Sequence, residues 1–271
     1  MPELPEVETT RRGISPHIIG KKITGITLRN ASLRWPIPND LNEKIQNKKV
    51  KSVERRGKYL LLAVANGHVI IHLGMSGSLR IMQNADAPQK HDHLDIHFGK
   101  NLALRYNDPR RFGAVLWTDE PLVEHRLLHH LGPEPLTENF NADYLFTRSR
   151  KHTQPIKSWI MDSKVVVGVG NIYANESLFN ANIHPLKSPQ EISLKQYQTL
   201  VSEIKRVLSH AIERGGTTLR DFVGGDGKPG YFAQELNVYG RGGLPCLKCN
   251  KILTEKRVAQ RSTVYCVECQ R

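Results

Sequence analysis

Four cysteines near the end of the chain constrain its fold more than any other feature. They are the only cysteines and form the pattern Cys246-x2-Cys249-x16-Cys266-x2-Cys269. Each pair suits a short turn that points two thiolates at one ion, and the spacer can form a two-stranded ribbon. Disulfides or a redox pair are the alternatives, but a cytosolic setting and the doubled motif favour metal. We therefore predict one structural zinc ion, because four protein ligands leave no position open to water.

This ribbon is too short to bury a sizeable core, so metal binding should supply much of its folding free energy. Basic side chains lie along the ribbon, at Lys248, Lys251, Lys256, Arg257 and Arg261. They suit a hairpin that rests on phosphates, and a solvated basic surface is the alternative.

The charge of the whole chain predicts a polyanionic partner. Its 39 Lys and Arg residues outnumber its 26 Asp and Glu residues, which gives a formal charge of +13. A merely basic soluble enzyme is the alternative, and charge alone does not separate DNA from RNA. No apolar run approaches the roughly 18 residues of a membrane span. The sequence begins with carboxylates at Glu3 and Glu6 where a signal peptide would be basic and then apolar. We expect a soluble, cytosolic protein without a membrane partner.

The first half of the chain predicts one helix followed by β-structure. Side chains recur at helical spacing at Leu4, Val7, Arg11 and Ile14. Pro5 suits the first turn, and we expect Gly13 and Pro16 to end this helix. From residue 23 to residue 117 the pattern changes to short β-like runs. Runs over 59–65 and 68–73 flank Asn66-Gly67, a strong hairpin signal, and runs over 94–98 and 102–106 repeat this around Gly99. We predict a β-sandwich or flattened barrel.

The second half predicts helices. Residues 131–135 read as a linker, and short helices are expected over 155–162 and 171–181. The clearest helix runs from Leu194 to Glu213, with a capping box at Ser193 and Gln196 and a stop at Gly215-Gly216. Residues 215–243 are rich in glycine and predict a long functional loop.

Six segments resemble the formamidopyrimidine-DNA glycosylase family and occur in the family's order. They are PELPEVETTRRG at 2–13, HLGMSGSLR at 72–80, YNDPRRFG at 106–113, VVGVGNIYANESLF at 166–179, DGKPGYFAQELNVYGR at 226–241 and the cysteine pattern. The resemblance implies an α+β multidomain protein with DNA between its domains. We expect a β-sandwich catalytic domain with a flanking helix over 1–133, a helix-two-turn-helix domain with a lesion-capping loop over 134–240, and a zinc ribbon over 241–271.

The resemblance also implies a bifunctional glycosylase and abasic-site lyase that excises oxidised purines. Removal of Met1 would give Pro2 a free secondary amine, which could attack the sugar C1′ and form an iminium, followed by β,δ-elimination. Glu3 matches the acid-base group, Lys58 the acid of β-elimination, and Arg261 the residue of δ-elimination. Without the resemblance, Glu3 would be interpreted as a helix-cap residue and Lys58 as a solvated lysine. Glu6 matches another acidic position, and a helix-dipole role is its alternative.

The remaining matches imply contacts with a duplex whose damaged nucleotide has been extruded. Met75, Arg110 and Phe112 match the residues that fill the resulting void, although Met75 and Phe112 read alone would be core residues. Residues 217–239 match the loop that closes over the extruded base. Phosphate contacts are expected from Asn171, Lys58, His91, Lys151 and Arg261.

Two other functions compete with this interpretation. A glycosylase resembling endonuclease VIII would share Pro2, Glu3 and the ribbon but prefer oxidised pyrimidines. A non-catalytic zinc-ribbon nucleic-acid-binding protein would have no use for a processed proline beside a glutamate. We favour the purine enzyme because the opening segment, the DPRRF segment and the glycine-rich loop of this sequence resemble those of that enzyme. We expect a monomer that acts on damaged double-stranded DNA in the bacterial cytoplasm, associated with the nucleoid.

Overall fold

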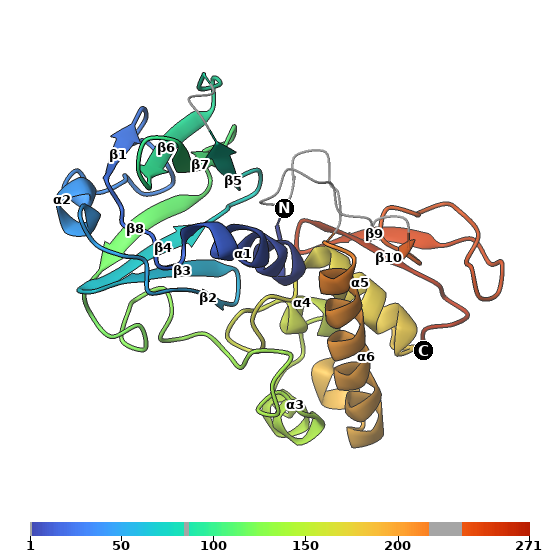
Figure 1. The fold of residues 1–271 in the computed structure, drawn as a ribbon. Coiled ribbons are helices and arrows are strands. Elements are labelled where there is room, and N and C mark those ends of the chain that lie inside the picture. Colours follow the sequence, from blue (N-terminus) through green and yellow to red (C-terminus); the bar gives the residue numbers. More distant parts are fainter. Residues whose placement is uncertain (1, 84–86, 217–234) are drawn as a thin grey trace. The chain divides into compact units, whose positions relative to one another are not determined.

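The computed structural model describes residues 2–83, 87–216 and 235–271 (Figure 1). The chain divides into two compact units, which are described separately here. One unit runs to His129 and includes Arg214 to Gly216; the other runs from His130 to Glu213 and includes residues 235–271. The first unit is mainly β-structure, and the second contains the longest helix and a two-stranded ribbon.

Two four-stranded antiparallel sheets lie in the N-terminal unit, as the short β-like runs of the sequence predicted (Figure 1). One sheet has the order β1-β6-β7-β5, and its strands are β1 (Gly25–Leu28), β6 (Asp92–His97), β7 (Leu102–Asn107) and β5 (Ser78–Gln83). The other has the order β2-β3-β4-β8, with β2 (Ser52–Arg56), β3 (Tyr59–Val64), β4 (Gly67–His72) and β8 (Ala114–Thr118).

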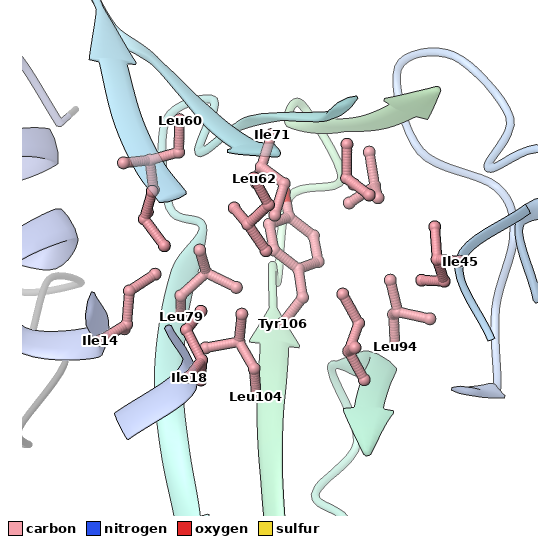
Figure 2. Close-up of a cluster of buried hydrophobic side chains, with 14 of the residues drawn as sticks. Ile14, Ile18, Ile45, Leu60, Leu62, Ile71, Leu79, Leu94, Leu104 and Tyr106 are labelled. Atoms are coloured by element: carbon pink, nitrogen blue, oxygen red, sulfur yellow. The ribbon is translucent and has the colours of Figure 1, made fainter. Parts of the chain in front are cut away.

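Apolar side chains from both sheets fill the space between them (Figure 2). Leu60, Leu62 and Ile71 from one sheet meet Leu79, Leu104 and Tyr106 from the other. Helix α1 (Leu4–Ile18) adds Ile14 and Ile18 to this core, and helix α2 (Leu41–Ile45) adds Ile45. All of these side chains are almost completely buried, so hydrophobic burial fixes both helices on the sandwich.

Helix α1 continues beyond the residues that were expected to end it. It passes Gly13 and contains Pro16, and ends at Ile18. Proline removes one backbone donor, but here it lies in the last turn, where little of the helix remains to be disrupted. Ile14 and Ile18 are buried on either side of it, and their burial favours the helical conformation.

The β3–β4 hairpin was correctly predicted, but its turn lies one residue earlier. Val64 pairs with Gly67, so the turn residues are Ala65 and Asn66. Gly67 belongs to β4, where a Cβ would collide with the backbone of Thr118 on β8. This glycine is therefore required for the close approach of two strands.

The second unit contains helices α3 (Ala142–Ser149), α4 (Ile156–Ile160), α5 (Asn171–Asn180) and α6 (Leu194–Glu213), a short 3-10 helix, η1 (Pro189–Glu191), and strands β9 (Thr254–Val258) and β10 (Arg261–Tyr265). The bounds of α6 agree with the prediction. Its capping box is present, because Ser193 N donates to Gln196 Oε1 and Gln196 N donates to Ser193 Oγ. Helix α3 was not predicted from the sequence; the side chain of Asn141 caps it.

Within the described residues, no helix combines the length and apolar character needed to cross a bilayer.

Candidate functional site

The start of helix α1 holds the residues expected to carry the chemistry. Pro2 is buried, and Glu3 occupies the N-cap position with only 1% of its surface exposed. The backbone N–H of Glu3 donates to Glu6 Oε2 at 2.8 Å, so Glu6 fixes the backbone beside Pro2. Glu3 is therefore both a helix-cap residue and a buried carboxyl group next to Pro2. Gly216 also lies here, where an added Cβ would be 3.0 Å from Glu6 Oε1.

An ion-pair network fixes α1 on the neighbouring sheet. Glu8 binds Arg11 and Arg12 of the same helix and Arg55 of β2, at 2.8 to 3.2 Å. Burial alone would raise the pKa of Glu8, but hydrogen bonds from Arg11 and Arg12 bring it down to about 2. Glu8 therefore stays ionised at neutral pH and holds helix α1, which begins two residues after Pro2, in a fixed position.

Lys58 lies in the turn between β2 and β3, close to His72 at the end of β4. Tyr59 pairs with His72 across the strands, and their rings are 4.9 Å apart. Burial and the charges of Lys58 and Arg34 lower the pKa of His72 to about 4. The Nδ1 atom of His72 accepts a hydrogen bond from Gly74 N, which fits a neutral ring. The ammonium group of Lys58 is thus close enough to His72 to favour its neutral state.

Two adjacent loops bring Met75, Arg110 and Phe112 together. Met75 follows β4, and the other two residues follow β7. The loops touch through Gly74, where a Cβ would lie 2.5 Å from the carbonyl carbon of Phe112. The guanidinium of Arg110 stacks over the ring of Phe112 at 4.8 Å. Met75 is 37% exposed and Phe112 45% exposed, so the interpretation of these two as core residues is wrong.

Helix α5 organises the polar residues of the second unit. Asn171 begins the helix, and its buried Oδ1 accepts no hydrogen bond from the described part of the chain. Asn175, one turn later, donates to the carbonyl of Asn171 and accepts from Val264 N on β10. The buried carboxylate of Glu176 accepts three backbone N–H bonds from residues 237–239 and one from the Asn237 side chain. The helix thus fixes both the ribbon strand and the segment leading into the ribbon.

The four cysteines form one cluster at the base of the ribbon. Their sulfur atoms lie within 4.8 Å of one another, and none forms a disulfide. The Cys246–Cys269 and Cys249–Cys266 sulfur distances are 4.0 and 3.4 Å. Four thiolates about 2.3 Å from a tetrahedral ion would be ~3.8 Å apart. The donor set and spacing therefore fit a metal ion such as zinc.

At the other end of the ribbon, Arg261 begins β10 directly after a tight turn. The two turn residues, Ala259 and Gln260, have φ values of 46° and 61°. Lys157 of α4 is almost fully buried and donates to the carbonyl of Ser262 at 2.6 Å. Arg261 is exposed, while the strand that carries it is held by α4 and α5.

The other expected contact residues lie at separate places within their units. In the first unit, the carbonyl of His91 accepts a hydrogen bond from Asp108 N, which places His91 beside the loop of Arg110. In the second, Lys151 is exposed just after α3. The expected loop over the extruded base lies mostly in residues 217–234, outside the described residues.

Sequence analysis missed several buried or partly buried polar residues, among them His72, Asp108, Asn175 and Glu176. Each stands inside a segment that carries the family resemblance. Their presence in such a segment was the only signal in the sequence. It could not identify their hydrogen-bond partners, which lie up to 89 positions away.

Comparison with protein families finds two matching models. The formamidopyrimidine-DNA glycosylase N-terminal domain matches residues 1–115, and the H2TH domain of the same glycosylase matches residues 131–223. The chain is 69% identical to the formamidopyrimidine-DNA glycosylase of Saccharophagus degradans over the full length of both proteins.

Solved structures show the same similarity. The Fpg (MutM) protein of Thermus thermophilus is 34% identical, with a TM-score of 0.89 over 99% of this chain and 98% of that protein. A Lactococcus lactis Fpg variant in complex with DNA containing Fapy-dG is 33% identical, with a TM-score of 0.93 over all of both chains.

Proposed function

This chain belongs to the formamidopyrimidine-DNA glycosylase family, base-excision-repair glycosylases for oxidised purines that also act as abasic-site lyases, and we propose that Pro2 and Glu3 carry its reaction on damaged duplex DNA. One observation supports this assignment above the others: Pro2 adjoins a buried carboxyl group at the start of a fixed helix. An amine at Pro2 would have an acid-base partner one residue away.

The proposed reaction begins with removal of Met1, because an amide nitrogen is not nucleophilic whereas a free α-amino group titrates near 8. The Pro2 nitrogen attacks C1′, the bond from C1′ to the base breaks, and the proton that the amine loses goes to the departing base. The ring oxygen takes a proton from Glu3 as the sugar opens, which leaves an iminium at C1′. The iminium accepts the electron pair released when C2′ loses a proton, and the 3′ phosphate leaves.

Lys58 and Arg261 are proposed to assist the elimination steps. An ammonium group can donate a proton or stabilise the phosphate that leaves in β-elimination. Arg261 would stabilise the second phosphate, lost in δ-elimination, with its permanently charged guanidinium. The neutral state of His72 supports the role of Lys58, because the imidazole adds no positive charge that would oppose the ammonium.

Met75, Arg110 and Phe112 are proposed to occupy the space that an extruded nucleotide leaves in the duplex. Phe112 can wedge a base step, Met75 can adapt to an irregular void, and Arg110 can hydrogen-bond the orphaned base. Their exposure at the tips of two touching loops supports this role.

We propose that phosphate contacts come from the N-terminus of α5 at Asn171 and from His91, Lys58, Lys151 and Arg261. The four cysteines would hold one zinc ion that shapes the ribbon and takes no part in the reaction. We also propose that the protein acts as a monomer in the bacterial cytoplasm, associated with the nucleoid.

Excision assays on matched duplexes test the proposed substrate. We expect faster release of 8-oxoguanine than of an oxidised pyrimidine, with cytosine as the preferred opposite base. Preference for the pyrimidine lesion would favour the endonuclease VIII-like alternative. Binding without excision of either lesion would favour a non-catalytic protein.

A further inference from the structure

Asp108 is a fully buried carboxylate located where the loops of Met75 and Arg110 meet. It directly follows β7 and precedes the segment that carries Arg110 and Phe112. No role has been given to it so far in the reaction or in contacts with DNA. A buried carboxyl group needs hydrogen-bond partners to offset the loss of water, so its partners show what it holds in place.

Both oxygens of Asp108 accept hydrogen bonds, and the donors come from both loops. Ser76 Oγ, next to Met75, donates to Oδ1 at 2.7 Å. Gly113 N, next to Phe112, donates to Oδ2 at 2.8 Å. The hydroxyl of Tyr106 also donates to Oδ2, at 3.2 Å. One carboxylate therefore binds the side chain of the residue after Met75 and the backbone of the residue after Phe112.

A relay extends this connection to the third exposed residue. Ser76 Oγ, which donates to Asp108, also accepts a hydrogen bond from Arg110 N at 3.2 Å. The backbone of Asp108 is itself fixed to β6, because its carbonyl oxygen lies 2.8 Å from Nε2 of the buried His93. The chain of bonds runs from the sheet through Asp108 and Ser76 to the backbone of Arg110.

The exposed residues depend on this backbone network for their positions. Met75 and Phe112 are more than one third exposed, so packing alone holds their side chains weakly. A residue that must enter a duplex at one base step needs its backbone fixed to within a fraction of an ångström. We propose that Asp108, acting through Ser76, is a positioning residue that sets the geometry with which Arg110 reads the opposite base. This inference rests on the proposed role of Arg110, Met75 and Phe112 in filling the void.

The main test compares Ser76→Ala with Ser78→Ala. Ser76→Ala removes the relay and leaves Asp108 in place, whereas Ser78 is a buried serine on β5 that serves as the matched control. Each variant, together with Arg110→Ala and Asp108→Asn, is assayed for excision of 8-oxoguanine opposite cytosine and opposite adenine. Nicking of an abasic site in single-stranded DNA, which has no opposite base, reports the chemistry alone.

We expect Arg110→Ala and Ser76→Ala each to narrow the preference for cytosine over adenine by about tenfold. In Ser76→Ala, nicking of single-stranded DNA should stay at the level of the parent protein, and Ser78→Ala should match the parent protein in every assay. The loss of preference in Asp108→Asn should lie between those of Ser76→Ala and Ser78→Ala. Its amide oxygen can still accept from Gly113 N, and the Ser76 hydroxyl can turn to accept from the amide nitrogen. A thermal melt of each variant identifies any loss of folding.

Two results would overturn the inference, and they can be told apart. If Arg110→Ala narrows the preference while Ser76→Ala and Asp108→Asn match Ser78→Ala, Asp108 positions nothing and the proposed function stands. The same conclusion follows if Ser76→Ala slows single-strand nicking as much as excision. If Arg110→Ala leaves the preference unchanged, the proposed role of Arg110 fails and the inference fails with it.

Discussion

The β-sandwich of the N-terminal unit and the cysteine ribbon hold their exposed side chains by different physical means. In the sandwich, a large apolar core between two sheets supports loops whose backbones are tied together by buried hydrogen bonds. In the ribbon, the buried cluster among the described residues is small: Val238, Leu253 and Val264 pack with Cys246, Cys266 and Phe179 of α5, and Cys269 is partly buried against them. A small element therefore depends on its supporting helix and on the proposed metal ion, where a large one can rely on burial.

Loss of the metal is expected to have the largest effect, because it should unfold the ribbon and leave the sandwich folded. Structural zinc contributes on the order of 10 kcal/mol to the folding of small metal-binding elements. Cys249→Ser should release the ion, unfold the ribbon and severely weaken DNA binding, while the sandwich keeps its cooperative melt. Metal analysis, DNA titration and circular dichroism check this. Val267→Ala, between two other cysteines, is the control, and unchanged metal content in Cys249→Ser would contradict the assignment.

Acid should weaken the sandwich through His72. Its pKa is about 4 in the folded protein and about 6.5 when unfolded, so between these values only the unfolded state gains a proton. Stability should therefore fall as the pH drops from 6.5 to 4, by about 3 kcal/mol at about 1.4 kcal/mol for each unit. His72→Asn, whose Oδ1 can still accept from Gly74 N, should remove most of this dependence.

Tryptophan fluorescence can follow the sandwich alone. Trp35 and Trp117 belong to the first unit, so a Trp159→Phe background reports its unfolding in urea. The exposed His17→Asn is the control and should keep the slope of stability against pH. An equal slope in His72→Asn would assign the pH dependence to another group.

A smaller effect is expected where α5 supports the ribbon. Glu176 accepts four hydrogen bonds from residues 237–239, and bonds to a charged group contribute roughly 1.5–3 kcal/mol each. Because an amide retains part of this network, Glu176→Gln should cost about 2 kcal/mol and make the metal easier to remove with a chelator. Glu203→Gln on α6 is the control, because the hydrogen bonds of this carboxylate lie at the surface. Equal chelator resistance of the two variants would show that the metal alone holds the ribbon.

The smallest expected effect concerns the turn before Arg261. Gln260 has a φ of 61°. Residues other than glycine and asparagine adopt this left-handed conformation at a cost in free energy. Gln260→Gly should stabilise the ribbon by about 1 kcal/mol, and Lys256→Gly in the extended strand β9 should destabilise it. Chelator titration measures both. A destabilised Gln260→Gly would show that the turn carries no strain.

Local patterns predicted the elements whose signals are periodic or confined to a few residues. The bounds of α6 and its capping box followed from spacing, and the cysteine cluster followed from two short motifs and a spacer. The turn near Gly67 was misplaced because that glycine serves a contact with β8, which no local pattern reveals. Helix α1 continued past Pro16 because tertiary burial outweighed the local stop signal.

The candidate site was less accessible to sequence reasoning because its contacts join distant positions. Read without the family resemblance, Met75 and Phe112 were assigned to the core, whereas the structure exposes both side chains. The bond from Ser76 to Asp108 spans 32 positions and the bond from Val264 to Asn175 spans 89. Hydrogen-bond partners at such separations are set by the fold, so they become visible only in the structure.

The most direct test of the account maps the covalent intermediate. Protein is mixed with DNA containing an abasic site, reduced with borohydride, digested and analysed by mass spectrometry. The account predicts one adduct, on a peptide that begins at Pro2 and lacks Met1, and no adduct in a form that retains Met1 but still binds the DNA. An adduct on an internal lysine such as Lys58, or full activity of protein that retains Met1, would contradict the central role of Pro2.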